Sequence, residues 1–214
     1  MKRYILWDND GVLVNTEFWY FKATQKALAE LGIVLPEPLY LRRMVRGESS
    51  WDLARAAGID AKRITQQKQQ RDADYRRYLA REHIDIPGVE SVLQALSKKY
   101  RMGIVTTSKR DHFEVIHNTR NLVHYMDFVL TREDYVSSKP SPEPYLLALN
   151  LFGAKAEECL VVEDSQRGLQ SALAAGIDCA VVYNQFTASH DFTGACYLLD
   201  SIVKLPGIID DRRT

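Results

Sequence analysis

Two aspartates follow the first apolar run of the chain. The stretch "YILWDNDGVL" places Asp8 and Asp10 directly after four apolar residues, with Gly11 behind them. Carboxylates that lie close together repel each other, and burying them without a partner is costly. This turn is therefore either a solvated loop or a place where a positively charged group binds.

Further polar side chains follow later apolar runs. Each has an ordinary explanation when taken alone, because a hydroxyl or carboxylate at the end of a strand can cap the next helix, and a single lysine is often a solvated loop charge. Together with the two aspartates, however, they make four carboxylates, one ammonium group and two hydroxyls. The additional residues are Thr106, Thr107, Lys139, Glu163 and Asp164.

Short apolar runs that alternate with helical patterns would position these groups. Runs of about four to six residues with β-branched content are typical of strands that are buried on both faces of a parallel sheet. Amphipathic stretches such as 89–100 and 165–176 predict the intervening helices. The predicted fold is therefore α/β, with a doubly wound, Rossmann-like parallel sheet. The expected strands are 4–7, 102–106, 127–130, 159–163, 179–183 and 196–199.

The carboxyl ends of parallel strands meet at one edge of the sheet, where ligands bind in such folds. The acidic groups would repel each other there unless a cation were present. Mg²⁺ prefers a few carboxylate or carbonyl oxygens together with water and substrate phosphate. Lys139 and Thr106 would bind the phosphate oxygens that the metal leaves free. The constellation predicts Mg²⁺-dependent phosphoryl transfer.

The segment from about residue 17 to residue 85 interrupts the alternation of strands and helices. Its pattern is helical throughout, and the α/β pattern returns near Pro87 and Gly88. The simplest arrangement is a helical insertion after the first strand. We therefore expect an α/β catalytic core at 1–16 and 86–214, and a helical cap domain at 17–85.

The composition argues against several classes of function. Among the 214 residues, 28 Lys and Arg balance 28 Asp and Glu, so no basic excess indicates nucleic acid or a membrane surface as a partner. Three cysteines without CxxC spacing argue against a disulfide framework and a zinc site. No apolar run approaches the roughly 20 residues that span a bilayer, and the N-terminus lacks the apolar region of a signal peptide. We expect a cytoplasmic protein, and its size suits a monomer.

Four motifs carry a family resemblance. "DNDGVL" at 8–13, Thr106 at a strand end, Lys139 before a proline, and "EDS" at 163–165 occur in that order. They resemble the four motifs of the haloacid dehalogenase-like hydrolase superfamily, and the resemblance covers essentially the whole chain. "SKPSPEPY" and "EDSQRGLQSALAAGI" are most similar to the branch that contains β-phosphoglucomutase and small sugar-phosphate or phosphoglycolate phosphatases.

The resemblance implies a role for each catalytic residue. Asp8 would attack phosphorus and form an aspartyl-phosphate, and Asp10 would act as the general acid and base. Thr106 and the backbone N–H of Thr107 would bind the transferring phosphoryl group. Lys139 would neutralise phosphate charge and restrain the nucleophile.

The resemblance also implies a metal site and substrate contacts. Mg²⁺ would be held by Asp8, the carbonyl of Asp10 and Asp164, with Glu163 either a direct ligand or a partner of one. Contacts to the small phosphorylated substrate are expected at three further positions. These are Lys109, Gly47 and Arg77.

Particular residues argue against three alternative functions. Haloacid dehalogenases lack the second aspartate of the first motif, so Asp10 argues against dehalogenation. The mutase branch has a cap histidine and a cap arginine where this chain has Tyr20 and Ser50. A phosphatase is therefore favoured over a sugar-phosphate mutase. A phosphorylatable receiver-like regulatory domain is less favoured still, because such domains have no helical cap and no DxDG pair.

Overall fold

The computed structural model describes residues 1–211, and for Asp210 and Asp211 it describes the backbone alone. The chain forms two compact units. One unit combines Met1–Asn15 with the chain from Asp85 onward, and the other is Thr16–Ile84. The chain thus leaves the first unit after its first strand and returns to it seventy residues later.

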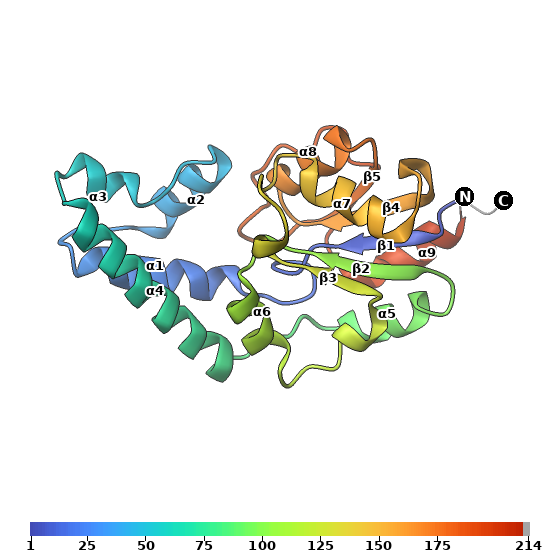
Figure 1. Cartoon of the computed structure of the whole chain (residues 1–214), viewed down its shortest axis with the longest axis horizontal. Helices are drawn as coiled ribbons and strands as arrows, with labels where there is room; N and C mark the ends of the chain where they lie inside the picture. Colours follow the sequence, from blue (N-terminus) through green and yellow to red (C-terminus); the bar gives the residue numbers. More distant parts are fainter. Residues whose placement is uncertain (212–214) are drawn as a thin grey trace. The chain divides into compact units, whose positions relative to one another are not determined.

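The first unit is built on a parallel sheet of six strands in the order β3-β2-β1-β4-β5-β6 (Figure 1). Every neighbouring pair of strands is parallel. The predicted α/β fold is confirmed, and each predicted strand is present within about one residue. The strands are β1 (Tyr4–Trp7), β2 (Arg101–Val105), β3 (Phe128–Leu130), β4 (Cys159–Glu163), β5 (Asp178–Val182) and β6 (Tyr197–Leu199).

Helices pack against both faces of this sheet. One apolar cluster joins Ile5 and Trp7 of β1 to residues of α5, α6 and α9. The other joins Tyr4 and Leu6 of the same strand to residues of α7 and α8. Because successive side chains of a strand point to opposite faces, burial on both sides requires a continuous apolar run. The helices are α5 (Val89–Leu96), α6 (Arg110–His117), α7 (Glu143–Phe152), α8 (Gln166–Ala174) and α9 (Leu205–Asp211).

The second unit is helical, and its described residues include no strand. Its two long helices, α1 and α4, pack on each other through aromatic pairs such as Trp19 with Tyr78, whose ring centroids lie 5.3 Å apart. Asp60 caps the N-terminus of α4 by accepting a hydrogen bond from the backbone N–H of Arg63. The helices are α1 (Glu17–Ala29), α2 (Glu37–Val45), α3 (Asp52–Ala56) and α4 (Ala61–Arg81).

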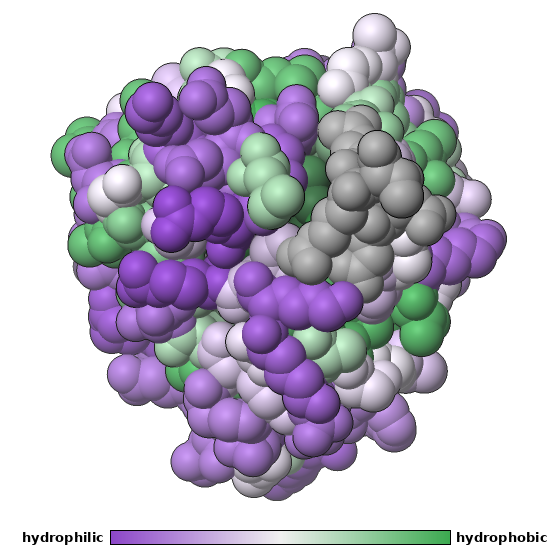
Figure 2. Space-filling view, turned by 90° about the vertical axis from the view of Figure 1, so that its right-hand side faces the viewer, coloured by the Kyte–Doolittle hydropathy of each residue, from purple (hydrophilic) through white to green (hydrophobic). Residues whose placement is uncertain are grey.

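Three general properties of the molecule bear on its class: the polarity of its surface, the length of its helices and the state of its cysteines. Hydrophilic residues predominate on the visible part of the face near the chain termini, and hydrophobic residues form small separate groups there (Figure 2). Among the described helices, none is both long and apolar enough to cross a membrane. The three cysteines are free thiols, and Cys159 and Cys179 are buried.

Candidate active site

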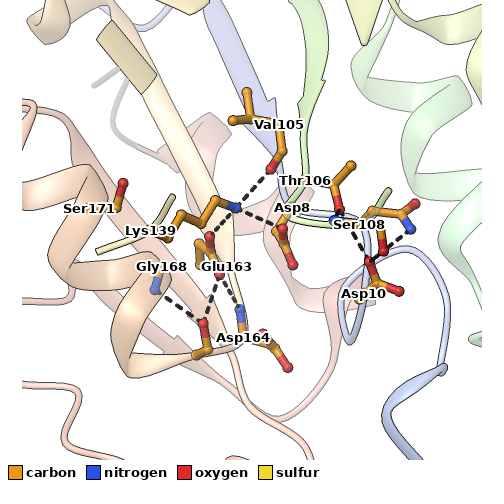
Figure 3. A network of polar contacts seen from close by, with 12 residues as sticks. Asp8, Asp10, Val105, Thr106, Ser108, Lys139, Glu163, Asp164, Gly168 and Ser171 are labelled. Atoms are coloured by element: carbon orange, nitrogen blue, oxygen red, sulfur yellow. Dashed lines mark hydrogen bonds and ion pairs between the residues drawn. The ribbon is translucent and has the colours of Figure 1, made fainter. Parts of the chain in front are cut away.

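The polar groups that follow the strands lie at one edge of the sheet. Strand β1 lies between β2 and β4, so the residues that follow these three strands are neighbours. Asp8 comes directly after β1 and Thr106 directly after β2, while Asp164 comes directly after β4. Lys139 arrives from the loop before α7 and lies between Asp8 and Glu163 (Figure 3). The structure thus brings residues from four distant segments into one cluster.

Lys139 is at the centre of this cluster and only 4% exposed. Its Nζ donates to Asp8 Oδ1 at 2.7 Å, to Glu163 Oε1 at 2.7 Å and to the carbonyl oxygen of Val105 at 2.8 Å. These three acceptors satisfy all three N–H groups of the ammonium. Burial by itself would lower the pKa of Lys139, but the charges of Asp8 and Glu163 outweigh it and raise the pKa above its usual value. The lysine therefore stays charged.

Asp8 is a buried carboxyl group among other acids. Burial raises its pKa from 3.8 to about 8, and the charges of Glu163 and Asp10 add to the rise, although Lys139 opposes it. Oxygen atoms of Asp8, Glu163 and Asp164 all lie within 4.8 Å of one another. A carboxylate in this setting requires further positive charge to be anionic at neutral pH. The donor set consists of hard oxygen atoms, which suits Mg²⁺.

Glu163 is held by donors on both of its oxygen atoms. Oε1 accepts from Lys139 and from the hydroxyl of Tyr145 at 2.7 Å. Oε2 accepts from the hydroxyl of Ser165 at 3.3 Å. A Cβ atom on Gly168 would lie 1.8 Å from the Glu163 carboxyl carbon, so this helix position requires glycine. These contacts hold the Glu163 carboxylate against Lys139.

The carboxylate of Asp10 faces the hydroxyls that follow β2. Its Oδ2 accepts from Ser108 Oγ at 2.7 Å, from Thr106 Oγ1 at 3.2 Å and from Asn9 Nδ2 at 3.3 Å. The backbone N–H of Ser108 donates to Thr106 Oγ1 at 3.0 Å. The hydroxyl of Tyr135 donates to the carbonyl of Thr106 at 2.7 Å and so anchors this turn. Asp10 is thus hydrogen-bonded to two hydroxyls of the turn that follows β2.

A buried histidine supports the first turn. His117 Nε2 lies 2.8 Å from Asn9 Oδ1. Burial lowers the pKa of His117 to about 4, and the charge of Arg120 also lowers it, while Asp10 opposes them. The imidazole is therefore neutral at pH 7, and because an amide oxygen can only accept, the proton lies on Nε2. The amide group of Asn9 then directs its NH₂ toward Asp10.

Of the other predicted substrate contacts, two belong to the α/β unit and two to the helical unit. The side chains of Thr107 and Lys109 are exposed, between the end of β2 and the start of α6. Gly47 and Arg77 belong to the helical unit. Gly47 has a φ of 66° after α2, and Arg77 forms an ion pair with Asp74 on α4.

Several residues that support the acids were given no role by the sequence, among them Tyr145, Gly168 and Asn184. Tyr145 and Gly168 lie within the motifs "SKPSPEPY" and "EDSQRGLQSALAAGI", but neither was assigned a role from the sequence, and in the structure both support Glu163. Asn184 follows β5 and donates from Nδ2 to Asp164 Oδ2 at 2.8 Å. Its place after a strand is a signal that could have identified it, because the same reasoning identified the residues after β1, β2 and β4.

A sequence model of one protein family matches most of the chain. The sequence model described as "Haloacid dehalogenase-like hydrolase" matches residues 5–182. The chain belongs to the haloacid dehalogenase-like hydrolases. The family resemblance drawn from the four motifs is confirmed, and so is the expectation that the protein is an enzyme of this family.

Relatives and solved structures of this family resemble the chain over most of its length. The phosphorylated carbohydrates phosphatase of Thermotoga maritima is 28% identical, over 81% of this chain and 82% of its own. The fructose-1-phosphate phosphatase YqaB of Escherichia coli is 27% identical, over 81% of this chain and 93% of its own. The crystal structure of CbbY from Rhodobacter sphaeroides in complex with phosphate matches with a TM-score of 0.82 and 25% identity, over 96% of each chain.

Proposed function

We propose that this hydrolase is a Mg²⁺-dependent phosphatase that acts on a small phosphorylated metabolite, a sugar phosphate or a phosphoglycolate-like ester. The observation that carries the proposal is the contact of buried Lys139 with Asp8 and Glu163, with Asp164 within 4.8 Å of both acids. The names of the two phosphatase relatives and the phosphate bound to CbbY support the same substrate class.

Three groups would hold the metal. They are the carboxylates of Asp8 and Asp164 and the backbone carbonyl of Asp10. When bound, Mg²⁺ would offset the burial and the neighbouring acid charges that raise the pKa of Asp8, and would stabilise negative charge on the phosphoryl oxygens. Glu163 would hold Lys139 in place, since both of its oxygens already accept hydrogen bonds.

The first chemical step transfers the phosphoryl group to Asp8. A carboxylate oxygen of Asp8 attacks phosphorus, the ester P–O bond breaks, and the leaving oxygen takes a proton from Asp10. The hydroxyl of Thr106 and the N–H of Thr107 bind the phosphoryl oxygens during this transfer. Lys139 favours the anionic form of Asp8 and restrains its carboxylate through the 2.7 Å contact.

The second step hydrolyses the aspartyl-phosphate. Water attacks phosphorus while Asp10, now ionised, accepts a proton from it. The bond between phosphorus and Asp8 breaks, so that inorganic phosphate leaves and the carboxylate is regenerated. Two displacements divide a barrier that is among the highest known for an uncatalysed biological reaction.

We propose the helical unit as the cap that selects the substrate. This assignment rests on the family resemblance, and we expect substrate contacts at Gly47 and Arg77. The guanidinium of Arg77 already pairs with Asp74, so a substrate anion would have to compete with that carboxylate. Lys109, which is exposed beside the Thr106 turn, is the proposed contact from the α/β unit.

Phosphate release tests the proposal. The wild-type protein with Mg²⁺ is expected to release phosphate from p-nitrophenyl phosphate and from some members of a panel of phosphorylated sugars and organic acids. Asp8→Asn should abolish release, whereas Asp191→Asn, a change at an exposed acid of the same unit, should leave it intact. If no compound in the panel released phosphate, the proposal would be wrong. Transfer within a sugar bisphosphate that outpaces hydrolysis would instead indicate a mutase.

A further inference from the structure

Asn184 contacts Asp164, an acid of the proposed metal site, from the loop that follows β5. It follows β5, and its Nδ2 donates to Asp164 Oδ2 at 2.8 Å. We propose that Asn184 is a positioning residue that orients the carboxylate of Asp164 and thereby sets the affinity for Mg²⁺. This inference rests on the proposed function in one respect, which is that the cation is Mg²⁺.

The orientation of the Asn184 amide follows from its second contact. Its Oδ1 accepts from the backbone N–H of Phe186 at 2.9 Å, so the NH₂ group must face Asp164. The backbone N–H of Asn184 donates to Thr187 Oγ1 at 3.0 Å, and its carbonyl accepts from the N–H of Ala188 at 2.9 Å. Rotating the amide would break both side-chain contacts at once. The loop therefore holds the donor in one position.

Gly11 encloses the same contact from the opposite side. This glycine has a φ of 84°, and a Cβ atom on it would lie 2.1 Å from Asp164 Oδ2 and 3.0 Å from Asn184 Nδ2. The turn after β1, the end of β4 and the end of β5 thus pack directly on one another. The oxygen of Asp164 that faces Asn184 is confined between that amide and the Gly11 backbone.

The chemistry of an amide suits this position. Asp8 and Glu163 are oriented by a cation, Lys139, which also offsets their charge. Asn184 is neutral, so it orients Asp164 without neutralising it and leaves its negative charge to attract a cation. Groups that hydrogen-bond to metal ligands commonly account for 10–100-fold in metal affinity.

Direct titration of the full-length protein with Mg²⁺, without substrate, tests the inference. Asn184→Ala is expected to raise the Kd for Mg²⁺ by about 10–100-fold. Asn184→Ser should do the same with less disturbance of the loop, because its hydroxyl can still accept from the Phe186 N–H but is too short to reach Asp164. Gln185→Ala is the matched control, since this neighbouring amide is exposed and its loss should change the Kd by no more than about twofold.

The outcomes separate this inference from the proposed function. A Kd for Mg²⁺ in both Asn184 variants within about twofold of wild type would overturn it. If the wild-type protein binds Mg²⁺ with the expected dependence on Asn184 but releases no phosphate, the positioning role stands and the phosphatase proposal fails. If the wild-type protein binds no Mg²⁺, both are wrong. In an active enzyme, the Mg²⁺ concentration for half-maximal rate should rise in both variants while kcat at saturating Mg²⁺ changes much less.

Discussion

Replacing Lys139 with methionine removes the positive charge from the buried cluster while keeping a side chain of similar length. Asp8 and Glu163 then lose the ammonium that contacts both of them at 2.7 Å. Breaking a buried ion pair by removing one partner costs about 3–5 kcal/mol, because the remaining charge has no compensation. For a domain of this size, the loss corresponds to a fall in Tm of roughly 10 °C.

The loss of stability in Lys139→Met should depend on pH. In the wild-type protein without metal, burial already raises the pKa of Asp8 from 3.8 to about 8. Without Lys139 the pKa should rise further. Above about pH 8 the folded wild-type protein loses this proton whereas the folded variant keeps it, so the free energy of unfolding of the variant decreases relative to wild type as pH rises through this window. The variant should therefore lose more stability relative to wild type at about pH 9 than at about pH 6, where Asp8 is protonated and neutral in both folded proteins.

Thermal unfolding in EDTA at both pH values measures this difference. Lys204→Met is the matched control, because Lys204 forms an exposed ion pair with Asp200 that is 2.7 Å long. Exposed pairs of this kind contribute less than about 1 kcal/mol. A Lys139→Met protein that loses the same stability at both pH values, or no more than the control loses, would refute the reasoning. Phosphate release should fall in parallel, since the nucleophile would be protonated and less restrained.

Three further perturbations have definite expected results. Gly168→Ala should lower both Tm and activity, because its Cβ would lie 1.8 Å from the Glu163 carboxyl carbon. Gly207→Ala is the control in the same thermal scan. No atom of the described residues lies within 4 Å of its Cβ, so it should raise Tm slightly. His117→Leu removes the donor to Asn9 and leaves a buried amide oxygen unpaired, at a cost of about 1–3 kcal/mol. Steady-state kinetics of this variant should show a lower kcat with little change in KM, and a change in KM alone would contradict a role in orienting Asp10. Chelation by EDTA should stop phosphate release and added Mg²⁺ should restore it, whereas activity that survives chelation would exclude a required metal.

The position of the acids relative to the sheet could be predicted from the sequence. A strand that is buried on both faces needs a continuous apolar run, and "YILW" and "CLVV" are such runs. Parallel strands end at a common edge, so the acids that follow these two runs had to lie near each other. The register bears this out, since β1 pairs directly with β4. Fold class and family followed from these local features.

Which atoms contact one another was decided by the tertiary structure alone. Lys139 lies 131 residues from Asp8; the family resemblance implies that it restrains this nucleophile, but nothing in the sequence predicted its contact with Glu163. His117 has no spacing that sets it apart, yet packing buries it against Asn9. Asn184 becomes relevant only because β5 lies beside β4. Apolar periodicity is local and can be read along the chain, whereas these contacts depend on distances across the sheet edge that exist only once the strands have assembled.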